Sequence, residues 1–291
     1  MTTTDTGTNQ GAAARPVVEI AGVDKVFDAS GGRTKALEGI DLRIQAGEFV
    51  SLIGPSGCGK STLLRLIGDL TAPTTGTVAI NGKPARQARL DRDYGIVFQA
   101  PVLFDWRTVQ ANVALPLEVK GLSRAERDER VRSMLDLVEL SGFARHYPYQ
   151  LSGGMQQRVS IARALALEPS ILLMDEPFGA LDEMTRERLN SEVQRIWQQT
   201  GTTIVFVTHS IPEAVFLSSR VVVMSPRPGR IVRVIDIDLP RPRTDDTRET
   251  PRYFELITEV REALRGRRGD GDGAGAGIAS AERTMAEGAV G

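Results

Sequence analysis

Cysteine is almost absent from this sequence, since Cys58 is the single one in 291 residues. One cysteine cannot form a disulfide within the chain, and its isolation also argues against a metal site built from thiolates. Both conclusions fit a protein that works in a reducing compartment such as the cytosol.

Long hydrophobic runs are missing as well. The longest apolar stretches, such as 171–174 and 203–207, are only long enough for a β-strand, whereas a membrane-spanning helix needs about 18 or more apolar residues. Residues 1–15 are rich in Thr, Gly and Ala without an apolar segment, so we do not expect a signal peptide. If the protein works at a membrane, it must dock onto a partner that is embedded there.

Neither sign of charge is in excess. The formal net charge is −1, which predicts no strong preference for nucleic acid or anionic lipid. Lysine is scarce, because arginine supplies all of the 36 basic residues except Lys25, Lys35, Lys60, Lys83 and Lys120. A lysine at a motif position is therefore informative.

The chain divides into four expected segments. Residues 1–15 and 266–291 are expected to be disordered, because Gly, Ala and charged residues bury too little area to offset chain entropy. Residues 16–240 are expected to form one folded domain with a helical part at about 100–165. Residues 241–265 are expected to form an extension that contains a helix.

Short apolar segments alternate with segments of helical periodicity along the folded part. We expect strands at about 17–20, 40–44, 48–52, 77–80, 170–174, 203–207, 220–224 and 229–237, and helices at about 60–67, 182–199 and 253–264. The order of strand, helix and strand, with fully apolar strands, predicts an α/β fold whose parallel sheet is covered on both faces.

The helical part contains a clear start signal. Ser123 and Glu126 have the spacing of a capping box, in which each side chain bonds the backbone of the other residue. Apolar residues then recur at helical spacing and predict one buried face, formed by Val131, Met134, Leu135 and Val138. Gly142 is expected to end this helix.

The segment Gly54-Pro-Ser-Gly-Cys-Gly-Lys-Ser61 matches the phosphate-loop pattern. It follows an expected strand and opens an expected helix, which argues against a chance match in a glycine-rich loop. Glycines let the backbone N–H groups converge on phosphate oxygens, and the helix N-terminus adds a positive dipole. The expected ATP-binding residues are Gly54, Ser56, Gly57, Cys58, Gly59, Lys60, Ser61 and Thr62.

Three side chains of this loop are expected to differ in their roles. Lys60 supplies a compact ammonium to the β- and γ-phosphates, and Ser61 offers its hydroxyl to Mg²⁺. Cys58 is not expected to be a nucleophile, because no histidine is near it in the sequence.

Two acids end an apolar strand at Asp175 and Glu176. Asp175 is expected to hold Mg²⁺ through water, and Glu176 to polarise the attacking water. An apolar strand that enters an acidic loop is common by itself. Together with the phosphate loop, however, the pair indicates a site for Mg²⁺ and for hydrolysis.

The segment Leu151-Ser-Gly-Gly-Met-Gln-Gln157 narrows the class, because a phosphate-loop protein with this motif before its acidic strand resembles the ABC ATPase family. The resemblance covers residues 17–240. It implies a P-loop NTPase with a RecA-like parallel-sheet core, an antiparallel β subdomain and a helical insert subdomain. It also implies ATP and Mg²⁺ as ligands, and a head-to-tail pair of cassettes that is expected to be a homodimer. In that pair, residues of one cassette would contact ATP bound to the other, here Ser152, Gly153, Gly154, Gln156 and Asp182.

Further positions carry the resemblance. Gln99 resembles the glutamine that touches Mg²⁺ and senses the transmembrane partner. Ala180-Leu-Asp182 resembles the loop that crosses the dimer seam. His209, which alone would be assigned a structural role, resembles the histidine near the γ-phosphate. Phe27 stands where the family usually has a tyrosine that stacks on adenine, and its ring keeps that stacking face. His146 matches no motif and is expected to be structural or exposed.

Longer stretches resemble the nitrate/sulfonate/taurine class of bacterial importers, which has relatives for bicarbonate and pyrimidine precursors. They are Met174–Asp182, 207–218, Met224–Gly229 and 114–118. This class implies transmembrane permease subunits, a solute-binding protein that acts indirectly, no nucleic acid, and a place at the cytoplasmic face of the membrane. About fifty residues follow position 240, fewer than the regulatory domain of some sugar and methionine importers needs.

Several alternatives stay open. The cassette could belong to an exporter or a lipoprotein-release complex, or less readily to a non-transport ABC ATPase. Phe104 and Trp106 are either part of the core or part of an exposed docking patch. Neither the transported solute nor the identity of the second cassette follows from the sequence.

Overall fold

The computed structural model describes residues 15–29 and 32–266. The expected disordered segments at 1–15 and 266–291 lie almost entirely outside this part of the chain. Within it, no helix is long and apolar enough to cross a membrane.

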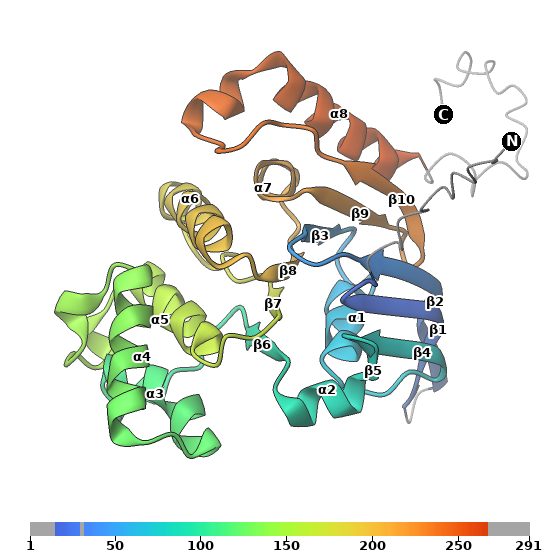
Figure 1. Cartoon of the computed structure of the whole chain (residues 1–291). Coiled ribbons are helices and arrows are strands. Elements are labelled where there is room, and N and C mark those ends of the chain that lie inside the picture. The colour runs from blue at the N-terminus through green and yellow to red at the C-terminus, as the bar shows by residue number, and fades with distance from the viewer. Residues whose placement is uncertain (1–14, 30–31, 267–291) are drawn as a thin grey trace, which may run out of the picture.

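The centre of the fold is a six-stranded sheet (Figure 1). Neighbouring strands from β9 through β6 are parallel, and β10 pairs with β9 in the antiparallel direction. The order across the sheet is β10 (Ile231–Asp236), β9 (Arg220–Met224), β3 (Phe49–Ile53), β8 (Thr203–Val207), β7 (Ile171–Asp175) and β6 (Tyr94–Val97). The α/β class predicted from the sequence is confirmed.

Both faces of this sheet are buried, as the continuous apolar strands predict. Alternate residues of one strand belong to different core clusters: Phe49 and Ile53 face one, and Val50 and Leu52 face the other. The first cluster continues into the helices after β6, and the second into α1 (Lys60–Ile67) and the second sheet.

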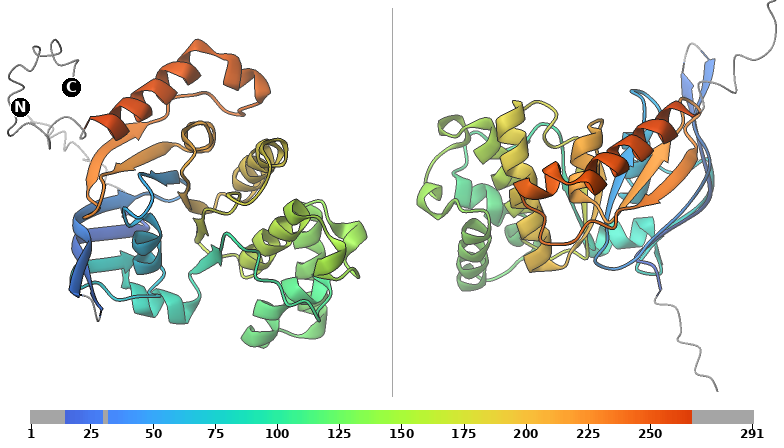
Figure 2. Two further views of the ribbon diagram at one scale, coloured as in Figure 1. Left: turned by 180° about the vertical axis from the view of Figure 1, so that it is seen from behind. Right: turned by 90° about the horizontal axis from the view of Figure 1, so that it is seen from above.

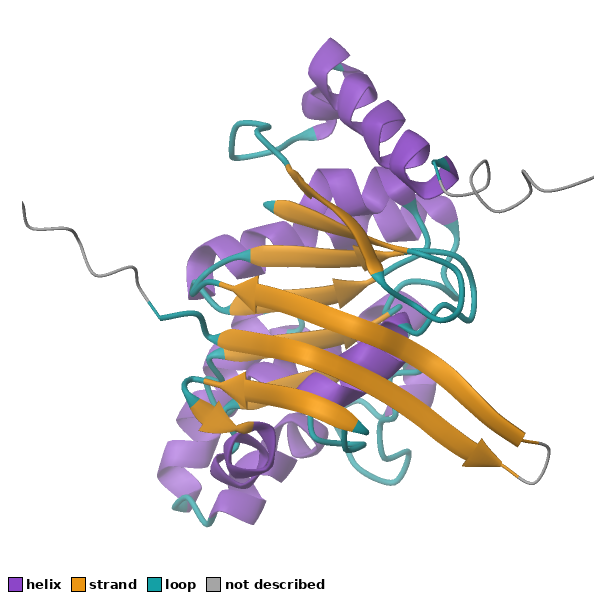
Figure 3. Cartoon of the chain, turned by 90° about the vertical axis from the view of Figure 1, so that its right-hand side faces the viewer, coloured by secondary structure: helices purple, strands orange, loops and turns teal. Residues whose placement is uncertain are grey.

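The second sheet is antiparallel and runs along one side of the molecule (Figure 3). Its order is β2 (Gly32–Ile44), β1 (Val18–Ala29), β4 (Thr75–Ile80) and β5 (Lys83–Pro84), followed by the short helix α2 (Ala85–Asp91). The β1–β2 hairpin is much longer than the predicted strands, because register shifts after Ile20 interrupt the alternation that identifies a strand in sequence.

Three helices form a group at the opposite side from the hairpin (Figures 1 and 2). They are α3 (Val109–Lys120), α4 (Arg124–Leu137) and α5 (Gly153–Leu165). The predicted capping box is present, since Ser123 accepts from the Glu126 N–H and Glu126 accepts from the Ser123 N–H. The predicted helix end at Gly142 is wrong. Helix α4 already ends at Leu137, and Gly142 lies in the short 3₁₀ turn Ser141–Phe143.

The remaining helices complete the layers. α6 (Glu183–Thr200) buries an apolar stripe that includes Leu189 and Val193, and α7 (Ile211–Leu217) is almost wholly buried. A 3₁₀ turn (Asp245–Glu249) leads into α8 (Pro251–Arg265), which packs on α7, β9 and β10. Figure 2 shows α8 lying along that edge of the sheet.

The turn between β9 and β10 makes a close backbone approach to the loop between β3 and α1. A Cβ atom at Gly229 would lie 2.0 Å from the Cys58 carbonyl oxygen, so only glycine fits there. Gly229 also donates a backbone hydrogen bond to the Ala36 oxygen at 2.9 Å and accepts one from the Glu38 N–H at 3.0 Å. This turn therefore ties β2 to the loop that precedes α1.

Substitution Gly229→Ala tests this approach. The added methyl group must push the Cys58 carbonyl away, and such overpacking costs about 1–3 kcal/mol of unfolding free energy. Urea denaturation of the two purified chains measures the difference. The control is Gly142→Ala, whose Cβ would meet no atom within 4 Å and which should change stability by less than about 0.5 kcal/mol. Equal stability of the two variants would contradict the close packing.

Candidate functional site

A cavity of about 310 Å³ opens where β3 and β7 end. Such a position is common for ligands, because the carboxyl ends of parallel strands and the N-termini of the following helices meet at one edge of a sheet. Its lining combines segments far apart in the sequence: Phe27, Thr34, Ala36, Ser56, Gly57, Gly59, Lys60, Ser61, Thr62, Glu176 and Arg227.

The loop after β3 curls before α1 and leaves the start of that helix without a side-chain cap. Gly57 and Gly59 adopt positive φ values of 74° and 105°, which curl the chain in a way that glycine permits at little cost. Gly59 is the N-cap of α1, and no side chain caps that helix. Because the first N–H groups of a helix have no partner within it, they can bind an anion here. The predicted residue Gly54 has a packing role, since its Cβ would lie 2.9 Å from the Met224 oxygen.

Lys60 is the first residue of α1, and its side chain folds back onto the start of the loop. Its ammonium donates to the Gly54 oxygen at 2.9 Å and to the Pro55 oxygen at 3.2 Å, and the residue is 5% exposed. Two neutral carbonyls hold the charge without neutralising it, so the group can interact strongly with a phosphate.

Ser61 and Asp175 come together across the loop, although 114 positions separate them in sequence. The Ser61 hydroxyl donates to the Asp175 carboxylate at 2.7 Å. A hydroxyl beside a carboxylate is a hard oxygen donor set. Mg²⁺ prefers such sets and completes its shell with water and substrate phosphates. The residues present therefore fit Mg²⁺ in the predicted place.

Glu176, His209 and Gln99 surround one point at the edge of the cavity. The Glu176 carboxylate lies 3.4 Å from His209 Nδ1, and its φ of 46° is uncommon for a residue with a side chain. A Cβ at Gly179 would lie 3.2 Å from Gln99 Nε2 and 3.7 Å from Glu176 Oε2, so the Gln99 side chain also reaches this cluster. Gln99 and His209 do not line the cavity itself.

Phe27 and Cys58 differ in exposure. Phe27 is 42% exposed, and the Lys25 ammonium lies 4.8 Å from its ring centroid, which orients the ring at the cavity wall. Cys58 is 1% exposed, and burial raises the pKa of its thiol. A raised pKa favours the unreactive thiol form, in agreement with the expectation that Cys58 is not a nucleophile.

The predicted trans-acting residues lie at the starts of α5 and α6, and none of them lines the cavity. Ser152 caps α5 by accepting from the Met155 N–H, and Asp182 caps α6 by accepting from the Thr185 N–H at 2.9 Å. This backbone hydrogen bond lowers the pKa of Asp182.

Small residues let the two caps approach each other. Cβ atoms at Gly153 and Gly154 would lie 3.2 Å and 3.0 Å from Leu181 and Thr185. Gln156 donates to the Pro148 and Leu151 oxygens, so its amide N–H groups hold the preceding turn. A role of these residues at a second cassette stays a prediction.

Sequence reasoning missed three lining residues: Thr34, Ala36 and Arg227. Thr34 and Ala36 come from the hairpin strand whose length was underestimated. Arg227 lies in the stretch Met224–Gly229, which the sequence had singled out only as a family resemblance. Arg227 contacts Gly57, which lies 170 positions earlier in the sequence. No short sequence pattern predicts such a contact.

Behind His209 lies a buried carboxyl group. Glu213 on α7 is 5% exposed and accepts a hydrogen bond from the Thr208 hydroxyl. Burial raises the pKa of Glu213, and Thr208, Arg186 and His209 oppose the rise. This acid lies next to a very small cavity of about 10 Å³ that Glu176 and His209 also line.

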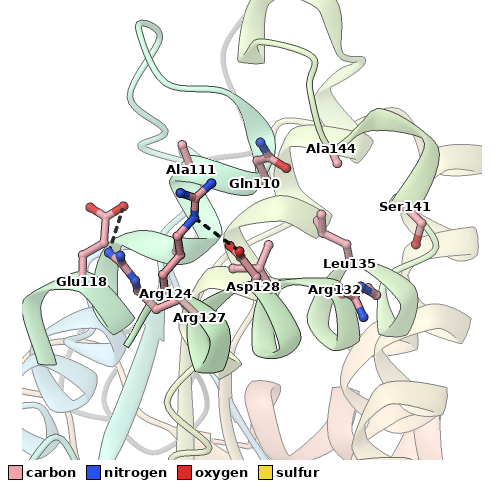
Figure 4. Close-up of a pocket in the computed structure, with 12 residues that line it drawn as sticks. Gln110, Ala111, Glu118, Arg124, Arg127, Asp128, Arg132, Leu135, Ser141 and Ala144 are labelled. Carbon is pink, nitrogen blue, oxygen red and sulfur yellow. Dashed lines mark ion pairs between the residues drawn. The ribbon is translucent and has the colours of Figure 1, made fainter. Parts of the chain in front are cut away.

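A larger cavity of about 730 Å³ lies between α3 and α4 (Figure 4). Two of its arginines lie near carboxylates, with Arg124 at 3.8 Å from Asp128 and Arg127 at 4.0 Å from Glu118. None of the motif residues lines it, so size alone does not identify the functional site.

The comparisons with known proteins all indicate the same family. The sequence model of the family described as ABC transporter matches residues 37–179. The chain is 49% identical over 243 residues to an uncharacterized ABC transporter ATP-binding protein of Methanocaldococcus jannaschii, which covers 84% of this chain and 90% of the relative. It is 45% identical over 256 residues to a nitrate import ATP-binding protein of Synechocystis, covering 86% and 96%. It is 43% identical over 236 residues to a taurine import ATP-binding protein of Roseobacter denitrificans, covering 81% and 87%.

Solved structures agree with this result. A dimeric structure of a bacterial ABC transporter cassette superposes with a TM-score of 0.67 at 39% identity, and covers 76% of this chain and 98% of that one. A dimeric post-hydrolysis state bound to ADP and phosphate has a TM-score of 0.66 at 38% identity, with the same coverage.

The buried acid Glu213 should make the stability of the folded chain depend on pH. Its raised pKa in the folded state means that the folded chain keeps a proton which the unfolded chain loses near the ordinary glutamate pKa of 4.5. Glu213 therefore contributes stability below that pH and loses it as the pH rises toward the folded pKa. Substitution Glu213→Gln keeps an acceptor for Thr208 and removes the ionisation.

We expect the unfolding free energy of Glu213→Gln, relative to the natural chain, to increase as the pH rises above the ordinary glutamate pKa of 4.5. Urea denaturation at several pH values measures this difference. Glu129→Gln, at an exposed position on α4, is the control and should give a flat difference. A flat difference for Glu213→Gln as well would contradict the buried proton.

Proposed function

Since this chain belongs to the ABC transporter family, we propose that it is the ATP-hydrolysing subunit of an importer for a small solute of the nitrate, sulfonate or taurine class. The chain is an ATPase that uses ATP and Mg²⁺. The observation that carries the proposal is the cavity in which Lys60, Ser61 and Glu176 meet. The similarity to import ATP-binding proteins over nearly their whole length supports the choice of an importer.

Binding of the nucleotide follows from the phosphate loop. The N–H groups at the start of α1 and the Lys60 ammonium bind the phosphates, and Phe27 offers its exposed ring to the adenine. Ser61 and Asp175 would hold Mg²⁺, which supplies positive charge to the phosphate oxygens when it is bound.

Hydrolysis needs a base for the attacking water. Glu176 is proposed to accept the water proton at its carboxylate, while His209, 3.4 Å from that carboxylate, fixes its direction. Gln99 reaches the same cluster from the segment after β6 and would report the state of the site to that segment.

Completion of the site needs a second cassette. Ser152, Gly153, Gly154, Gln156 and Asp182 are proposed to contact ATP held by the other cassette, because on their own chain they lie outside the cavity. The dimeric solved relatives support this arrangement.

A groove of about 480 Å³ on the side of β6 and α3 offers a place for a permease segment. Its lining is largely apolar, and Val102 and Val119 are 59% and 66% exposed. Arg163 donates to the Pro101 and Val102 oxygens, which shapes one wall. An exposed apolar groove of this kind favours a protein partner. A permease segment that inserts here would place the chain at the cytoplasmic face of the membrane.

The aromatic pair Phe104 and Trp106 lies at the same groove. Phe104 lines the groove, and its ring centroid is 4.9 Å from that of Trp106. Trp106 is 75% exposed, so the alternative that it belongs to the core is wrong.

Substitution Glu176→Gln should lower ATP turnover by about 100-fold or more, because a positioned general base contributes that much. ATP affinity should change by less than about threefold, since the amide keeps the shape of the carboxylate. Phosphate release and nucleotide titration measure the two quantities. Glu129→Gln is the matched control and should hydrolyse normally. Near-normal turnover of Glu176→Gln would remove Glu176 from the role of base.

Substitution Val119→Asp tests the permease groove. Tagged Glu176→Gln protein with and without Val119→Asp is used to capture partners from detergent-solubilised membranes in the presence of ATP. We expect the parent to recover a multi-spanning permease and a solute-binding protein. The added charge should reduce recovery by about tenfold, because it must be desolvated in an apolar contact.

Phe254→Asp is the control, since Phe254 is 56% exposed on α8, outside the groove. Equal recovery with both charged variants would move the permease contact elsewhere. Capture of ribosomal or DNA-repair proteins without a permease would overturn the transport function and leave the ATPase.

A further inference from the structure

The turn between β9 and β10 is a closed structure of residues 225–230. Ser225 and Arg230 exchange two hydrogen bonds of 2.9 Å: the Ser225 N–H donates to the Arg230 oxygen, and the Arg230 N–H donates to the Ser225 hydroxyl. The same hydroxyl donates to the Pro228 oxygen at 3.1 Å. Ser225 is 5% exposed, so these bonds are partly shielded from water and give the turn a defined shape.

This turn is also fixed to the walls of the nucleotide cavity. Gly229 bonds the backbone of Ala36 and Glu38 on β2, and the Arg230 guanidinium pairs with Glu38 at 2.6 Å. Ala36 itself lines the cavity. These contacts attach the turn to β2 beside the phosphate loop.

Arg227 extends from this turn onto the phosphate loop. Its Nε and Nη2 both donate to the Gly57 carbonyl oxygen, at 3.2 Å and 3.1 Å. A Cβ at Gly57 would lie 3.4 Å from Nη2, which shows how closely the guanidinium covers the loop. Two donors on one oxygen hold the plane of the guanidinium, and its other N–H groups stay available.

The charge of Arg227 is placed where a polyphosphate needs it. Among the residues that line the cavity, Lys60 and Arg227 are the cations and Glu176 is the anion. Arg230 in the same turn is paired with a carboxylate, whereas the hydrogen bonds of Arg227 go to a neutral carbonyl that does not cancel its charge. Arginine is suited to phosphate because its planar N–H groups match two oxygens at once.

We propose that Arg227 is a further nucleotide-binding residue, which contacts the phosphates of ATP while it holds Gly57 in place. The inference rests on the proposed nucleotide site. It adds the β9–β10 turn as a wall of that site, with a second cation beside Lys60. Because the guanidinium is exposed, its contribution is screened by salt more strongly than that of the buried Lys60 ammonium.

The experiment measures ATP affinity of the full chain by competition with a fluorescent adenine nucleotide, at about 50 mM and about 300 mM NaCl. The variants are Arg227→Gln, Arg227→Lys, Arg230→Gln and Lys60→Met. We expect Arg227→Gln to weaken ATP binding by about 5- to 20-fold at low salt. Its affinity should also depend less on salt than that of the natural chain. Arg227→Lys should restore part of the loss, because it keeps the charge.

Arg230→Gln is the matched control, since Arg230 belongs to the same turn but does not line the cavity. The thermal midpoint of each nucleotide-free variant is recorded in parallel. If Arg227→Gln binds ATP like the natural chain, the inference is wrong. It is also wrong if both Arg227 variants lose affinity equally with an unchanged salt dependence, since Arg227 would then only support the loop.

The Lys60→Met variant separates the two proposals. If it loses ATP binding while Arg227→Gln does not, the proposed site stands and the inference about Arg227 falls. If Lys60→Met binds ATP normally, the nucleotide does not occupy this cavity, and both proposals are overturned.

Discussion

The start of α1 must offer backbone N–H groups to a ligand, so no side chain caps it, and much of the surrounding structure serves that requirement. Gly59 caps the helix without a side chain, and Lys60 is buried between carbonyl groups instead of beside a carboxylate. Unpartnered donors and a buried ammonium are unfavourable by themselves. The strands below and the β9–β10 turn beside the loop pack closely against it and help to hold it in this conformation.

The site also requires that its acids lie beside the phosphate loop, and the parallel sheet places them there. Strands β3, β7 and β8 are adjacent and parallel, so the residues that follow them meet at one edge. Ser61 thereby reaches Asp175, and His209 reaches Glu176, although neither pair is close in sequence. Because both faces of these strands are packed, a shift of one residue in register would exchange side chains between the two core clusters and displace the residues at the strand ends from one another. The rigidity of the core therefore sets the precision of the site.

The parts that sequence predicts well are those whose signal is local. A phosphate loop between a strand and a helix, two acids at a strand end and a capping box each lie within a few residues, and the structure has each where it was expected. The long hairpin was underestimated because its bulges break the alternation of side chains. The end of α4 was placed too late, at Gly142. The helix ends at Leu137, and its apolar periodicity and packing stop before the glycine is reached. Arg227 could not be found, because its partner is defined only once the sheet has formed.

A single chain presents two helix starts suited to an anion, and they lie in different surroundings. The start of α1 lines the cavity, whereas the start of α5, with Ser152 and two glycines, packs beside the loop that ends at Asp182 and lines no part of it. If each is to contact the same phosphate chain, the second must come from another molecule. On the proposed function, ATP would then be shared between two cassettes. Cleavage of ATP followed by release of the phosphate would remove charge that both helix starts bind, and this would allow the pair to separate.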